Sequence, residues 1–334
     1  MIKKILKWFF IFCVLLAILY LLGPKVKFDS IENSPITLSI PLTELDNYLT
    51  SSEERVSDIK LNNEAKIIWA RGTKSKTEYA VVYLHGFSAS REEGAPLHTD
   101  FAKRYGANLY LPRLRDHGRK TKDTFKNMTP QELLDSAREA VAIGKLLGEK
   151  VILMSCSTGG TYSIILSIND PAIHSMLMYS PNIDLYDPTS NLITMPWGKQ
   201  LLNVVMDGAY NSIKYDSLPK QYWNDTYHTD GIIAMKYLIE ETMTTENFEQ
   251  IDIPFYMGYY YEDEEHQDHV VSVKRMLDFY DASSTPDHLK RKETLNEAKR
   301  HVMTSHVMSD HVDSVAKKLY DYSENILGLI PIEN

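Results

Sequence analysis

The amino-acid sequence predicts an α/β fold in which helices cover both faces of a mostly parallel central sheet. The first observation is an alternation, from residue 65 onward, of short β-rich runs with segments of helix length. The second is size and composition, because 334 residues with 43% hydrophobic and 24% charged content can bury a large core. The third is a break in the alternation at about 182–250, which indicates an inserted helical cap.

The alternation opens with two predicted strands and a helix. "AKIIWARG" at 65–72 and "YAVVYLHG" at 79–86 have the composition of strands. A helix is expected over about 95–105, because Gly106 follows it as a terminal glycine. "ANLYLPRL" at 107–114 supplies the next strand, so the order is strand, helix, strand.

The next predicted helix has the clearest boundaries in the chain. Thr129 is the expected N-cap, Pro130 takes the first helical position, and Glu132 completes a capping box. The helix is expected to end at Gly148. Its apolar stripe consists of Leu133, Leu134, Ala137, Val141 and Leu147.

The sheet is expected to continue on both sides of the cap. "KVILMS" at 150–155 predicts a buried strand, a helix follows over about 158–168, and "SMLMYS" at 175–180 predicts another strand. After the cap, the expected elements are a strand at 253–261, a helix at about 270–281, a weaker strand at 289–295 and a last helix at about 309–327.

The N-terminal segment 1–27 predicts a membrane helix ahead of a domain that spans 28–334. Lysines 3, 4 and 7 precede an uncharged apolar run from Trp8 to Gly23, which is close to the length of a spanning helix. The run does not end in the small residues of an Ala-x-Ala cleavage site, so a retained anchor is favoured over a cleaved signal. Cleavage would leave the domain secreted. The lysine distribution places the N-terminus in the cytoplasm and the domain outside it.

Charge and cysteine content exclude two classes of protein. The net charge of −9 is spread along the chain without a run of basic residues, so a nucleic-acid partner is not expected. The two cysteines, Cys13 and Cys156, cannot form a disulfide framework, since Cys13 lies in the apolar segment.

Ser157 is the candidate nucleophile. A serine hydroxyl needs a general base and donors for the developing oxyanion, and a tight turn from a strand into a helix supplies both. "SCSTG" at 155–159 fits such a turn, although Ser155 stands where glycine is usual. By itself the pattern also fits an ordinary polar loop.

"LHGF" at the end of an earlier predicted strand strengthens the interpretation of Ser157. When a nucleophile lies on a turn from a strand into a helix, one oxyanion donor is the N–H of the next residue. The other donor comes from the loop that follows a strand earlier in the chain. The predicted oxyanion hole therefore consists of the backbone N–H groups of Phe87 and Thr158.

From about residue 60 to its end, the chain resembles the α/β-hydrolase superfamily. The blocks that carry the resemblance are "LHGFSAS", "YLPRLRDHG", "SPNIDLYDP", "MPWGKQL", "YYYEDEEHQDHVVSV" and "EAKRHVMTS". They are similar to bacterial lysophospholipase-like and monoacylglycerol-lipase-like hydrolases, close to the serine aminopeptidase group. The resemblance implies the α/β-hydrolase fold and a chain order of serine, acid and histidine.

The resemblance selects the acid and the base. It implies that Asp268 is the acid, because Val-Val follows two residues later, and Asp263 is the alternative. It implies that His301 in "HVMTS" is the base, with His306 in a second "HVM" as the alternative. His311 is expected in the last helix, at the surface.

The sequence predicts a serine hydrolase that cleaves carboxylic esters through an acyl-enzyme intermediate. The substrate is expected to be a small-molecule or lipid ester, and a serine peptidase or a non-catalytic binding protein of the same fold remain alternatives. Neither a metal nor another cofactor is expected, because no established metal or nucleotide motif occurs near His266, Asp268 or His269 or elsewhere.

The cap contains apolar side chains for which two interpretations stay open. They could line an acyl pocket, but helices packed on a sheet bury such residues as core, which is favoured for most of them. The residues are Leu192, Ile193, Met195, Trp197, Met206, Trp223 and several tyrosines.

Overall fold

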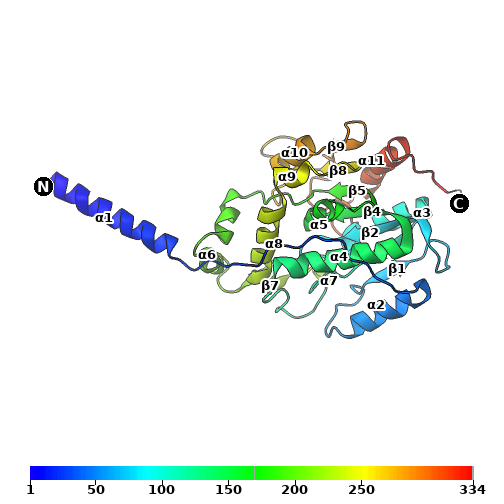
Figure 1. Cartoon of the computed structure of the whole chain (residues 1–334), viewed down its shortest axis with the longest axis horizontal. Coiled ribbons are helices and arrows are strands. Elements are labelled where there is room, and N and C mark those ends of the chain that lie inside the picture. The colour runs from blue at the N-terminus through cyan, green and yellow to red at the C-terminus, as the bar shows by residue number, and fades with distance from the viewer. Residues whose placement is uncertain (169, 333–334) are drawn as a thin grey trace.

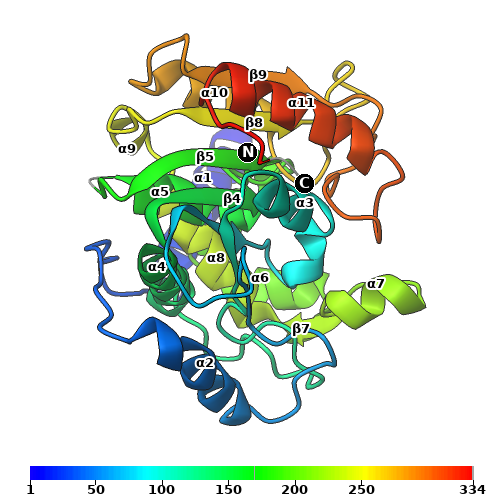
Figure 2. The ribbon, with the colours of Figure 1, turned by 90° about the vertical axis from the view of Figure 1, so that its right-hand side faces the viewer.

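The computed structural model describes residues 1–168 and 170–332, and one sheet lies at its centre (Figure 1). Within the described residues, seven strands pair in the order β1-β3-β2-β4-β5-β8-β9. They are β1 (Lys66–Ile68), β2 (Thr77–Leu84), β3 (Asn108–Leu111), β4 (Gly148–Cys156), β5 (Ile173–Tyr179), β8 (Phe255–Tyr259) and β9 (Lys290–Thr294). All neighbours are parallel except β1, which runs antiparallel to β3 at one edge. The predicted, mostly parallel sheet is confirmed, and Figure 2 shows β4, β5, β8 and β9 side by side in this order.

Helices cover both faces of the sheet. One face packs against α4 (Pro130–Leu147), α5 (Thr158–Ser167) and α10 (Val273–Ala282), and the other against α3 (Leu97–Arg104) and α11 (Val312–Asn325). Because side chains of a strand alternate between faces, β2 places Val82 and Leu84 on the α4 side and Val81 and Tyr83 on the α3 side. Both faces are therefore buried, which explains why the strands have continuous apolar runs.

The boundaries predicted for helix α4 are confirmed. The Thr129 hydroxyl accepts a hydrogen bond from the N–H of Glu132, and the Glu132 carboxylate accepts one from the N–H of Thr129. This capping box satisfies two of the N–H groups that have no partner inside the helix.

The chain between β5 and β8 forms the cap. Its elements are η3 (Pro188–Thr194), α6 (Gly198–Val205), β6 (Tyr210–Ser212), α7 (Ser217–Tyr222), β7 (Thr226–His228), α8 (Thr229–Thr242) and α9 (Thr245–Phe248). The predicted helical cap also contains two short strands, since β6 and β7 pair as an antiparallel hairpin. These short strands lack the regular alternation that makes a hairpin visible in sequence.

A buried lysine attaches helix α8 to the chain that leaves β5. The ammonium of Lys236 lies 2.7 Å from Asp184 Oδ1 and 2.7 Å from Asn191 Oδ1, and 3.3 Å from Glu240 on the next helical turn. Lys236 is 1% exposed, so these partners replace the water that its charge has lost.

The N-terminal helix α1 (Ile2–Leu21) projects away from the body, at the end of the molecule opposite α11 (Figure 1). None of its residues is buried. Among the described residues it is the one helix that is long and apolar enough to cross a membrane. Three smaller helices complete the chain: η1 (Leu42–Glu44), α2 (Leu45–Glu54) and η2 (Arg91–Gly94).

Candidate active site

Ser157 occupies the sharp turn between β4 and α5. Its backbone has φ 54° and ψ −125°, a conformation that residues with a side chain rarely adopt. The N–H of Ser157 donates a hydrogen bond to the Tyr179 carbonyl at 3.0 Å. The Ser157 carbonyl accepts from the N–H groups of Gly160 at 2.8 Å and Asn182 at 2.9 Å. The surrounding backbone thus maintains the strained turn that a nucleophile at a strand-helix junction requires.

The turn lies so close to β2 that two positions require glycine. A Cβ atom at Gly159 would lie 1.8 Å from the Leu84 carbonyl oxygen, and one at Gly86 would lie 2.9 Å from Cβ of Ser157. The loop that carries Gly86 and Phe87 therefore packs directly against Ser157.

Asp268 and His301, which are 33 residues apart in sequence, form a hydrogen-bonded pair. Asp268 lies in the loop after β8, and His301 lies between β9 and α11. The distance between His301 Nδ1 and Asp268 Oδ2 is 2.7 Å. The other carboxylate oxygen of Asp268 accepts from the N–H groups of Val270 at 2.9 Å and Val271 at 3.3 Å. The carboxylate is therefore held in one orientation, and it holds the imidazole in turn.

The two partners shift each other's pKa in opposite directions. Burial raises the pKa of Asp268, but the His301 charge and hydrogen bond outweigh it, so the net pKa is lowered. Burial lowers the pKa of His301, but the charge and hydrogen bond of Asp268, aided by the charge of Glu93, raise it above its usual value.

Ser157 and His301 both line a cavity of about 470 Å³ beneath the cap. Phe87 and Thr158 also line it. Its remaining wall is largely apolar and comes in good part from the cap, with Ile213, Tyr215, Trp223, Tyr227, Ile232 and Met235. The cavity has the size and character of a small-ligand site. A slightly larger hollow of about 530 Å³ near α2 and α4 is lined by charged residues and does not include Ser157.

The fold has clear structural relatives. No protein-family model matches the sequence, and no curated protein matches it either. One of the metagenome-derived lipolytic enzymes LipS and LipT is similar to this chain with a TM-score of 0.63 at 14% identity, over 80% of this chain and 100% of its own. The monoacylglycerol lipase of Paleococcus ferrophilus has a TM-score of 0.54 at 14% identity, over 77% and 96%. An α/β hydrolase from Penicillium sp. sh18 has a TM-score of 0.51 at 15% identity, over 76% and 92%. The chain has the α/β-hydrolase fold.

In this α/β-hydrolase fold, two backbone N–H groups beside Ser157 have no acceptor within the described part of the chain. Neither the N–H of Phe87 nor that of Thr158 donates a hydrogen bond to any residue in the ranges 1–168 and 170–332. Thr158 is the first residue of α5, where the helix dipole also favours negative charge. Both groups remain available to an oxygen atom in the cavity.

Ser155, the unusual residue of the motif, points toward helix α5. Its side chain is fully buried, and its Oγ lies 3.0 Å from Oγ of Ser163. The φ of Ser155 is not positive, so this position imposes no conformation that glycine alone would adopt.

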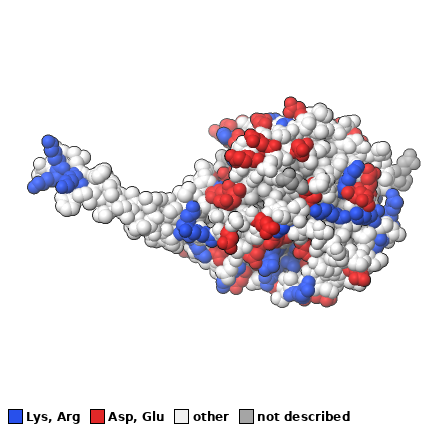
Figure 3. All heavy atoms as spheres, in the orientation of Figure 1, with Lys and Arg blue, Asp and Glu red and all other residues white. Residues whose placement is uncertain are grey.

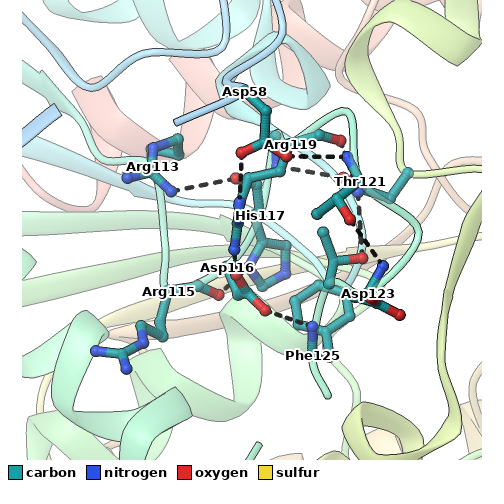
Figure 4. Close-up of polar contacts among 12 residues, drawn as sticks. Asp58, Arg113, Arg115, Asp116, His117, Arg119, Thr121, Asp123 and Phe125 are labelled. Carbon is teal, nitrogen blue, oxygen red and sulfur yellow. Dashed lines mark hydrogen bonds and ion pairs between the residues drawn. The ribbon is translucent and has the colours of Figure 1, made fainter. Parts of the chain in front are cut away.

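The loop after β3 supports the Phe87 side chain. Asp116 binds the guanidinium of Arg119 and the N–H of Phe125, and Arg119 also pairs with Asp58 at 3.0 Å (Figure 4). This network holds Phe125 stacked on Phe87, with ring centroids 4.6 Å apart.

His117 lies inside this loop. Its ring packs edge-on against Phe87 and against His85. Burial lowers the pKa of His117 to about 4, so the ring is neutral at ordinary pH.

Glu93 is a buried acid at the site that the sequence interpretation missed. It lines the same cavity as His301, and its carboxylate accepts from the Gly86 N–H at 2.7 Å and the Tyr83 hydroxyl at 3.2 Å. Burial raises the pKa of Glu93 to about 7, although the Gly86 hydrogen bond and the His301 charge oppose the shift. Nothing in "SREEGAP" distinguishes it from the less buried Glu92, so no local signal could have found it.

The structure does not bring the alternative residues to Ser157. Asp263 is exposed and pairs with His266 at 2.9 Å. His306 and His311 are exposed, and His311 immediately precedes α11. His269 packs against the Tyr186 ring instead of joining His266 and Asp268. Among the described residues, no group of three or more His, Cys, Asp or Glu side chains could hold a metal ion.

Cys156, beside the nucleophile candidate, is fully buried. Burial raises the pKa of its thiol well above the usual value, so it remains protonated and unreactive.

Neither interpretation of the apolar cap residues, as core or as pocket lining, holds for three of them. Trp223 is buried and lines the cavity, but Leu192, Met195 and Trp197 are exposed and belong neither to the core nor to the cavity wall. Amphipathic spacing predicts that a face is apolar, but it does not specify what covers that face.

Proposed function

We propose that this protein is a serine hydrolase that cleaves carboxylic esters through an acyl-enzyme intermediate. One observation carries the proposal: Ser157, on a strained turn, lines the same apolar cavity as His301. The Nδ1 atom of His301 lies 2.7 Å from Oδ2 of the buried Asp268. A nucleophile, a base and an orienting acid from three separate loops form the constellation required for acyl transfer.

In the proposed mechanism, Ser157 Oγ attacks the ester carbonyl carbon while His301 Nε2 takes the serine proton. The Phe87 and Thr158 N–H groups donate to the developing oxyanion, and the Asp268 carboxylate stabilises the imidazolium. The C–O bond to the alcohol then breaks, and His301 returns the proton to the leaving alcohol. Water, activated by the same histidine, hydrolyses the acyl-enzyme to the acid and regenerates Ser157.

Esters with an apolar acyl group are the proposed substrates. The cavity wall carries tyrosine, tryptophan, isoleucine and methionine side chains, with few polar groups apart from the catalytic candidates. The lipolytic enzyme and the monoacylglycerol lipase that share the fold support this substrate class.

We also propose that α1 is a retained membrane anchor that leaves the hydrolase domain outside the cytoplasm. Its most apolar window of 18 residues has a mean hydropathy of 2.2, and none of its residues is buried against the body. The whole helix is about 30 Å long, close to the hydrocarbon thickness of a bilayer, and the lysines in its first two turns can extend their ammonium groups to the headgroups. Three lysines precede its apolar stretch, which favours a cytoplasmic N-terminus.

A fluorophosphonate probe tests the hydrolase proposal. The wild-type chain is expected to be labelled covalently, and Ser157→Ala is expected to abolish labelling. The His301→Ala variant should be labelled more slowly than the wild type. The matched variant His306→Ala should be labelled at the wild-type rate. An unlabelled wild-type chain would indicate a non-catalytic binding protein instead.

Paired substrates test the reaction class. Turnover of p-nitrophenyl esters of increasing acyl length is compared with turnover of aminoacyl p-nitroanilides by the same preparation. Faster hydrolysis of the esters is expected, with a preference that reflects the apolar cavity. Faster hydrolysis of the anilides would replace the esterase proposal with a peptidase.

A further inference from the structure

The cap carries an exposed apolar surface near the base of α1. This apolar cap surface consists of Leu192, Met195, Trp197, Leu201, Val204 and Val205, all of them exposed. Helix α6 buries Leu202 toward the body and presents the last three of these residues outward, with Val204 77% and Val205 70% exposed. Single exposed apolar residues are ordinary, but a contiguous group marks a contact surface.

Two hydrogen bonds join this surface to the end of α1. The backbone N–H of Trp197 donates to the Pro24 carbonyl at 2.8 Å, and its indole N–H donates to the Leu19 carbonyl at 3.3 Å. The indole also packs on the backbone of Gly23, where a Cβ atom would lie 2.0 Å from the indole nitrogen. Figure 1 accordingly shows α6 beside the point where α1 meets the body.

These contacts set the depth of the surface relative to a bilayer that α1 spans. Leu19 lies in the last turn of α1, which would end at the boundary between hydrocarbon and headgroups. Trp197 would therefore lie at that boundary, where tryptophan is enriched in membrane proteins. The rest of the apolar cap surface lies close to Trp197 in the chain, with Leu192 on η3, Met195 just after it and the other three residues on α6.

The charges around the surface fit the same placement. In Figure 3, Lys and Arg side chains gather at the far end of α1, and the stretch between that end and the body is uncharged. Lys25 and Lys27 follow α1, and Lys199 on α6 pairs with Asp230 at 2.6 Å. The exposed residues Asp187, before η3, and Asp207, after α6, flank the apolar segment in the chain, so the apolar residues between them are the part suited to enter the interface.

We propose that the apolar cap surface rests in the interface of the membrane that α1 spans. The inference depends on the proposed anchor and not on the proposed ester hydrolysis. The docked surface belongs to the cap, whose helix α8 supplies Ile232 and Met235 to the cavity wall. The membrane contact would therefore bring the cavity close to molecules dissolved in the bilayer.

Site-directed fluorescence on the full-length chain in phosphatidylcholine vesicles tests the proposal. The parent is Cys13→Ser, in which the remaining Cys156 is fully buried. An environment-sensitive NBD dye is attached at Val204→Cys on α6 or at Met195→Cys after η3. The matched control is Leu61→Cys, an exposed leucine between α2 and β1.

The dye at 204 and at 195 is expected to show blue-shifted emission and quenching by lipids that carry a doxyl group near the headgroup. The dye at 61 is expected to emit as in water and to escape quenching. Emission at 204 and 195 as water-like as at 61 would overturn the proposal. A different result would also overturn the proposal: a blue shift that occurs without quenching by the lipids and that disappears when each vesicle holds a single chain. That result would show that a second copy of the chain covers the apolar cap surface. Loss of residues 1–27 from membrane-derived protein, detected by intact mass, would also overturn it.

Discussion

The Glu93 carboxylate accepts a hydrogen bond of 2.7 Å from the backbone N–H of Gly86. Gly86 immediately precedes Phe87, whose N–H is a proposed oxyanion donor, so the acid supports the loop that carries both residues. The same carboxylate raises the pKa of His301 through its charge. Glu93 therefore affects both the position of the loop that carries Phe87 and the pKa of His301.

Replacing Glu93 with glutamine is expected to extend activity to lower pH. Glutamine keeps an oxygen that can accept the Gly86 hydrogen bond, but it removes the charge that helps to raise the pKa of His301. His301 must be neutral to act as a base, so the acid limb of kcat/KM should shift to lower pH. The measurement is a pH profile with a p-nitrophenyl ester, and Glu92→Gln is the control. Coincident profiles for wild type and Glu93→Gln would show that the Glu93 charge does not act on His301.

Asp268→Asn is expected to reduce kcat by about 10³–10⁴-fold, because the imidazole loses both its orientation and the charge that stabilises its cation. The matched variant Asp263→Asn removes an exposed carboxylate that pairs only locally with His266, so its kcat should equal that of wild type. Steady-state kinetics of both variants measure the difference. A comparable loss in Asp263→Asn would contradict the assignment of the acid.

Ser155→Gly is expected to lower stability slightly and leave kcat/KM unchanged. Glycine inside a strand costs roughly 0.5–1 kcal/mol, and Ser163 keeps the Gly159 carbonyl as an acceptor at 3.0 Å. Ser155→Val adds volume against α5 and should cost about 1–3 kcal/mol. Chemical denaturation and ester kinetics provide the two readouts. A clear gain in kcat for Ser155→Gly would mean that the serine side chain strains the nucleophile turn.

Lys236→Ala is expected to reduce the free energy of unfolding by about 3 kcal/mol, because Asp184 and Asn191 lose a buried cationic partner. The control is Lys274→Ala, which breaks the exposed pair with Asp278 and should cost at most about 1 kcal/mol. Denaturant titration compares the two variants. Equal, small losses would contradict the view that Lys236 holds α8 to the chain after β5.

Local chemistry made much of the fold predictable. Thr129, Pro130 and Glu132 mark the start of α4 through contacts within one turn, and the observed helix begins at Pro130 as expected. The buried strand at 150–155 was equally clear, since continuous apolar runs require a sheet that is covered on both faces. The β6–β7 hairpin was not predicted, because its three-residue strands depend on pairing rather than on local preference.

The sequence does not predict what an apolar helix face packs against. Trp197 and Val204 have the sequence character of core residues, but the structure leaves both exposed, and Trp197 contacts the end of α1. Spacing along a helix defines a face, whereas tertiary structure decides whether that face meets a sheet, a cavity or the outside.

The sequence by itself determined the order of strands and helices, the candidate serine turn and the short list of acids and histidines, because these follow from local pattern and resemblance. Only the tertiary structure decided that Asp268 and His301 lie 2.7 Å apart while Asp263 and His306 lie at the surface. It alone placed the Glu93 carboxylate against the N–H of Gly86, next to Phe87. The reason is physical: a hydrogen bond depends on distance and burial, and loops far apart in the chain acquire both only when the sheet brings their ends together.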